Sequence, residues 1–102
     1  MTALSSEQRT RHHELAALLQ SSLAAIRELS DGYDFEFAWS RDTYKALAEL
    51  TPLEHACCPF FDIGVRIESG SNNLYWRLTG REGIKAFIRA EFGTWFGAKP
   101  NR

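Results

Sequence analysis

The sequence predicts a two-layer α+β domain in which a three-stranded sheet carries helices on one face. Three observations indicate this class: apolar residues at helical spacing near the N-terminus, an alternating aromatic segment after them, and two alternating aliphatic segments joined by a turn. The expected order is α-β-α-β-β-α. With 102 residues we expect one domain over 1–102, with an ordered core over about 5–96 and a loose tail over 97–102.

The first element is expected to be one long amphipathic helix. Ser5 and Gln8 have the capping-box spacing that opens a helix. Leucines and isoleucines then recur at helical spacing as far as Leu29, and Asp31-Gly32 provides a stop. His12 and His13 lie within this helix, where neighbours cannot share a face, and we expect both to be solvated.

The segment YDFEFAW, residues 33–39, is expected to be the first strand. Its alternation places aromatic rings on one face and Asp34 with Glu36 on the other, which is typical of a half-buried strand. The aromatic positions are Tyr33, Phe35, Phe37 and Trp39. A sheet so rich in rings could also wall a pocket for a small hydrophobic ligand.

The second helix is expected to start after Ser40 and to kink or restart at Pro52. In the restarted segment Thr51 would be the N-cap and Glu54 its reciprocal capping partner. Pro59 should end this short segment at or just before Cys58. Glu54 nevertheless falls within the apolar arc of the helical wheel, so a packed carboxylate is the alternative.

A β-hairpin and a final helix are expected to complete the fold. Residues 63–68 and 74–79 alternate in polarity on either side of SGSNN. Thr79 and Glu82 then have capping-box spacing. The inward stripe of the last helix would consist of Ile84, Phe87, Ile88, Phe92 and Trp95.

A right-handed crossover between the first two strands would leave a gap for the third and give the strand order 1-3-2. The aromatic strand 33–39 would then be an edge of the sheet. Because exposed edges invite pairing with another chain, we expect a homodimer.

The charge balance and hydropathy exclude two classes of partner. Twelve Lys and Arg stand against 13 Asp and Glu, so the surplus of cations that direct nucleic-acid binding needs is absent. No apolar run approaches the roughly 20 residues of a membrane span. We therefore expect a cytoplasmic protein with no membrane association.

The segment EHACCPFF, residues 54–61, contains the residues most suited to chemistry. Cys57 and Cys58 could be small packing residues, or they could bind a soft metal together with Glu54 or His55 as a harder ligand. A neighbouring pair suits Hg(II) or arsenite, whereas structural Zn(II) usually requires a second cysteine pair. Catalysis is disfavoured, because a helix C-terminus and a nearby carboxylate both raise a thiol pKa. We expect a non-enzymatic domain with reduced cysteines.

EHACCPFF and the later segment LYWRLTGREGIKAFI resemble a family of short uncharacterised bacterial proteins with an E-x-x-C-C-P-F motif. Similar segments are fused to MerR-type, heavy-metal-responsive regulators. The resemblance spans about Leu15 to Phe92 and implies metal sensing, or binding of a small ligand through thiols, by Glu54, Cys57 and Cys58. The chain departs from the family pattern at Pro52 and at Arg81, which stands where a proline is common.

Overall fold

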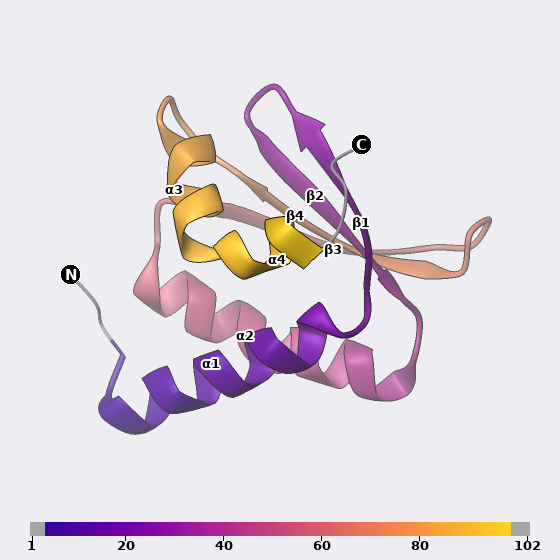
Figure 1. Ribbon diagram of the computed structural model, residues 1–102, viewed down its shortest axis with the longest axis horizontal. Coiled ribbons are helices and arrows are strands. Elements are labelled where there is room, and N and C mark those ends of the chain that lie inside the picture. Colours follow the sequence, from indigo (N-terminus) through magenta and orange to yellow (C-terminus); the bar gives the residue numbers. More distant parts are fainter. Residues whose placement is uncertain (1–3, 99–102) are drawn as a thin grey trace.

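The computed structural model describes residues 4–98, which form an α+β fold with a four-stranded antiparallel sheet (Figure 1). No helix in this range has the length and apolar character needed to cross a membrane. Of the expected tail, residues 99–102 lie outside the described range, while 97 and 98 belong to the last helix. The elements are α1 Ser6–Gln20, β1 Leu23–Leu29, β2 Gly32–Ala38, α2 Arg41–Cys57, β3 Asp62–Glu68, β4 Asn73–Thr79, α3 Ile84–Glu91 and α4 Gly93–Ala98.

The prediction of one long N-terminal helix is wrong, because its second half is strand β1. The expected capping box of Ser5 and Gln8 is present, but α1 ends at Gln20. A bulge near the start of β1 lets Leu23, Ala25 and Ile26 all be buried. The bulge breaks the strict alternation of a strand and leaves apolar residues two and three apart, a spacing easily taken for a helix.

The sheet therefore has four strands in the order β1-β2-β4-β3, and the prediction of three strands is wrong. The expected edge strand 33–39 corresponds to β2, which lies between β1 and β4. The edges are β1 and β3. The reason given for a homodimer, an aromatic edge strand, is thereby removed.

Helix α2 runs through Pro52 without a restart, which corrects a second expectation. Ser40 is its N-cap, as expected, and accepts a hydrogen bond from the Thr43 backbone N–H. Thr51 is not a cap, since its hydroxyl donates to the Leu47 carbonyl one turn earlier. Glu54 is consequently free of any capping role and points into the protein interior.

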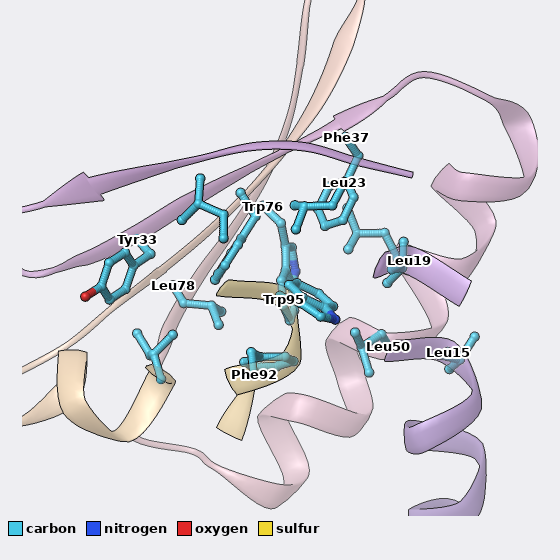
Figure 2. Packing of buried hydrophobic residues seen from close by; sticks show 14 of the residues in the cluster. Leu15, Leu19, Leu23, Tyr33, Phe37, Leu50, Trp76, Leu78, Phe92 and Trp95 are labelled. Atoms are coloured by element: carbon cyan, nitrogen blue, oxygen red, sulfur yellow. The ribbon is translucent and has the colours of Figure 1, made fainter. Parts of the chain in front are cut away.

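The core lies between the helices and the face of the sheet that carries the aromatic side chains of β2 and β4 (Figure 2). Rings from β2, β4, α4 and the junction between α3 and α4 meet there, each at most 2% exposed: Phe35, Phe37, Trp76, Trp95 and Phe92. Trp76 donates to the Thr51 hydroxyl on α2 and Trp95 to the Ala16 carbonyl on α1. Both indole N–H groups are thus satisfied while the rings tie helices to the sheet.

The C-terminal region forms two short helices rather than one. The expected capping box of Thr79 and Glu82 does not form, because the N-cap of α3 is Gly83, which has a left-handed backbone and makes no side-chain cap. The chain turns at Phe92 before α4 begins. Ile84, Ile88, Phe92 and Trp95 point inward as expected, whereas Phe87 is 39% exposed.

Candidate metal centre

Three helices bring five potential metal ligands together, and we call this group the thiol–carboxylate cluster. It contains His12 from α1, Glu54 and Cys57 from α2, Cys58 at the end of α2, and Glu91 from α3. Ligand atoms of Cys57, Cys58 and Glu91 all lie within 4.8 Å of one another. Those of His12, Glu54 and Glu91 do so too. Glu91 therefore links the two halves of the cluster.

Glu54 is a fully buried carboxylate with one paired and one unpaired oxygen. Its side chain is 0% exposed, and Oε1 lies 2.7 Å from His12 Nε2. Oε2 is buried and has no hydrogen-bond donor among the described residues. The hydrogen bond to Glu54 raises the pKa of His12, although burial opposes the shift. An unsatisfied buried carboxylate oxygen costs free energy unless a proton or a cation reaches it.

Glu91 can supply such a proton. Its side chain is 19% exposed and lies 3.8 Å from His12 Nε2. Burial raises the pKa of Glu91 to about 7, and the negative charge of Glu54 acts in the same direction. When Glu91 is protonated, its carboxyl group can donate a hydrogen bond to Glu54.

The two cysteines form no disulfide in the described residues, and their Sγ atoms lie 3.3 Å apart. Cys58 is 2% exposed, while Cys57 is only partly buried. Burial raises the pKa of the Cys58 thiol, and the hydrogen bond to Cys57 and the charges of Glu54 and Glu91 raise it further. Cys58 is therefore a neutral thiol at physiological pH and a poor nucleophile.

A cavity of about 270 Å³ connects the cluster with the protein surface. Three members of the cluster line it, and the chain just before α1 and the first turns of that helix provide the remaining wall. The lining residues are Leu4, Arg9, His12, His13, Cys57 and Glu91. A small ion could therefore reach the partly buried Cys57 and Glu91 without unfolding of a helix.

The structure separates the residues that the sequence grouped together. Glu54 pairs with His12, and the acid that joins the two thiols is Glu91. His55 is exposed and belongs to neither ligand group. His12 was expected to be solvated and is not, since its side chain is only 14% exposed.

Sequence reasoning missed His12 and Glu91, although a signal for both exists. His12 precedes the buried Leu15 by three residues and Leu19 by seven, so it continues the inward stripe of α1. In α3, Glu91 follows Ile88 by three residues and Ile84 by seven. A polar residue that continues the apolar stripe of a helix is expected to face the interior. When two helices each carry such a residue, the two side chains can meet there.

Comparison with known proteins assigns no family or function. No protein-family model, no curated protein and no solved structure matches this chain. The resemblance of EHACCPFF to a bacterial family stays a prediction. What the protein binds must follow from its own side chains.

Replacing Glu91 by glutamine should stabilise the metal-free protein above neutral pH. Glu91 has a raised pKa in the folded protein. Its contribution to the free energy of unfolding is therefore fully present below about pH 4.5, the ordinary pKa of a glutamate, and is lost as the pH rises through about 7. A glutamine amide donates to Glu54 at every pH. Because Glu91 is partly exposed, we expect a gain of only about 1–2 kcal/mol at pH 8, and none near pH 4.5. Urea unfolding across this range measures the difference, and parallel pH profiles for the two proteins would contradict it.

Proposed function

We propose that this protein is a non-enzymatic metal-binding domain that holds one thiophilic divalent ion in the thiol–carboxylate cluster. Cys57, Cys58 and Glu91 are the primary ligands, and His12 is the nearest nitrogen ligand. The observation that carries the proposal is the approach of both sulfur atoms and a Glu91 oxygen to within 4.8 Å of one another at a cavity open to solvent.

The types of donor atom favour Zn(II) or Cd(II). Two thiolates with a carboxylate or an imidazole form a ligand set that zinc commonly accepts. The sequence alone predicted Hg(II) or arsenite rather than zinc, because a structural zinc site usually needs a second cysteine pair. The oxygen and nitrogen atoms contributed by α1 and α3 supply what a second cysteine pair would otherwise provide. A borderline ion therefore matches the mixed set better than a purely sulfur-seeking one.

The electrostatics of the metal-free cluster also favour a cation. The negative charge of Glu54 disfavours ionisation of Glu91, and one oxygen of Glu54 has no donor among the described residues. A divalent ion would replace the proton of Glu91 and stabilise the Cys58 thiolate, whose formation is otherwise opposed. Binding should consequently release protons and strengthen as the pH rises.

Zinc affinity can be measured by competition with a chromophoric chelator on reduced protein. Cys57→Ser and Glu91→Gln should each weaken binding about 100-fold or more, since even changes outside the ligand shell often cost about 10–100-fold. We expect neither variant to destabilise the fold. Cys57 is partly exposed, and Glu91→Gln should be more stable than wild type above neutral pH. Loss of binding by a more stable protein cannot be attributed to misfolding.

The matched control is His55→Ala. His55 lies one residue from Glu54 on the exposed side of α2 and belongs to neither ligand group. Its replacement should leave zinc affinity within about twofold, whereas His12→Ala should lower it about 10-fold or more. Wild-type protein that binds zinc no better than Cys57→Ser would refute the proposal and favour the alternative, in which both cysteines serve packing alone.

A further inference from the structure

The two edges of the sheet are protected very differently. The pairing of β1 with β2 is interrupted by the bulge between Leu23 and Ala25, a device that discourages edge-to-edge association. Strand β3 pairs with β4 without interruption from Asp62 to Glu68. Its other side has no strand partner among residues 4–98. A regular edge of this length is a template for another strand.

Exposed apolar side chains are concentrated along this same edge. Seven large apolar side chains are exposed in residues 4–98, and four of them, with exposures of 39–52%, lie near this edge. Val65 and Ile67 belong to β3, Phe60 precedes it by two residues, and Phe87 of α3 packs against Phe60. Val65 and Ile67 pair with the buried Trp76 and Leu74, so they lie on the core face of the sheet. The tip of the β3–β4 hairpin projects beyond the helices, which leaves this part of the core face uncovered (Figure 1).

We propose that β3 pairs with β3 of a second copy of this chain, antiparallel and about a two-fold axis at Gly64. In this register Asp62 lies opposite Arg66 of the second copy, and the symmetry repeats the pair. Ile63 likewise lies opposite Val65 of the second copy on the core face. The two sheets then form one continuous eight-stranded sheet.

Charge selects this register over its neighbours. A two-fold axis at Val65 would place Asp62 opposite Glu68 of the second copy, and an axis at Arg66 would place two arginines opposite each other. Like charges at directly opposed positions destabilise a strand pair, whereas opposite charges stabilise it. Only the Gly64 register has complementary charges among these three. In the single chain Arg66 lies over the Tyr75 ring of β4 and contacts Asp34 and Glu68 through Nη2, so pairing with Asp62 of the second copy requires its side chain to turn toward the free edge of β3.

The apolar residues also find partners in the Gly64 register. Ile67 of the second copy lies opposite Phe61, next to the aromatic contacts among Phe60, Phe61 and Phe87. Phe60 and Phe87 line a hollow of about 630 Å³ at this end of β3. The exposed apolar residues at the two ends of the strand therefore cover each other across the axis.

Sedimentation velocity over a concentration series tests the interface. Wild type should sediment as a dimer at high concentration, and Asp62→Arg should weaken the dimer by at least tenfold, because it sets two cations opposite each other at both symmetric positions. The matched control is Glu68→Arg on the same face of the same strand. In the Gly64 register Glu68 lies opposite the uncharged Phe60 of the second copy, so this variant sets no like charges opposite each other and should remain dimeric.

Hydrogen exchange provides a readout that needs no variant. Backbone amides of β3 in the wild-type protein should exchange more slowly at high protein concentration, while those of β1 should not change. A wild-type protein that is monomeric throughout the series overturns the proposal. So does a dimer that Glu68→Arg dissociates and Asp62→Arg does not, or one that neither variant affects. Zinc affinity plays no part in these outcomes, so this proposal and the metal-binding proposal fail independently.

Discussion

Replacing Trp95 by alanine should cost about 3–5 kcal/mol of unfolding free energy, the largest effect expected for a single change. Trp95 is 1% exposed, and its ring lies 4.6 Å from Phe92, 5.1 Å from Phe35 and 5.6 Å from Phe37 between ring centroids. Its indole N–H also donates to the Ala16 carbonyl. The substitution would create a large cavity and detach α4 from α1. Urea unfolding followed by circular dichroism measures the loss.

Trp39 provides the control for Trp95. It is 42% exposed and has one aromatic neighbour, Tyr44, at 6.1 Å between ring centroids. Trp39→Ala should change the unfolding free energy by no more than about 0.5–1 kcal/mol, as is usual at the surface. Equal costs at the two positions would show that the core is not where the structure places it.

His12→Ala should cost about 3 kcal/mol when measured near pH 6, because it leaves the buried Glu54 without its partner. His12 has a raised pKa, so the charged pair is fully formed below about pH 6.5 and weakens as the pH rises through the raised value. The penalty should therefore shrink in alkaline solution. Chemical unfolding at several pH values measures it.

The adjacent His13 is the control for His12. It is exposed and lies on another face of α1. His13→Ala should stay within about 0.5 kcal/mol of wild type at every pH. If both substitutions had small, pH-independent effects, the buried pair of His12 and Glu54 would not contribute to the stability of the protein.

The sequence was a good guide wherever local chemistry decides the structure. The caps at Ser5 and Ser40 and the hairpin of β3 and β4 follow from short-range patterns, and the structure has each of them. The aromatic face of β2 is also present, except that Trp39 lies beyond the strand and is exposed. The end of α2 at Cys57, just before Pro59, belongs to the same group.

Errors arose where tertiary contacts override local preference. The segment 23–29 has helical spacing, yet pairing with β2 makes it a strand. Pro52 favours a break, yet α2 continues, and the hydroxyl of Thr51 supplies a hydrogen bond to Leu47 beside the proline. Both outcomes depend on distant parts of the chain that no short window contains.

The residues of the candidate site also fall into those that a local pattern reveals and those that only tertiary packing brings together. Cys57, Cys58 and Glu54 were recognisable because they occur within one short segment. His12 lies 42 residues before Glu54 in the sequence, and Glu91 lies 37 residues after it. Their approach to Glu54 and the cysteines therefore depends on how α1, α2 and α3 pack. The pairing of Glu54 with His12 rather than with the cysteines could not be read from spacing along a single helix.

Titration of the reduced protein with Cd(II), followed by cadmium–thiolate charge-transfer absorption, tests metal binding by the cluster most directly. Since this absorption requires sulfur bonded to cadmium, it reports on Cys57 and Cys58 themselves. The metal-binding proposal predicts a linear rise that saturates at one ion per chain, and no such rise in the Cys57→Ser, Cys58→Ser double variant. A folded, reduced wild-type protein that develops no absorption with excess cadmium would contradict it.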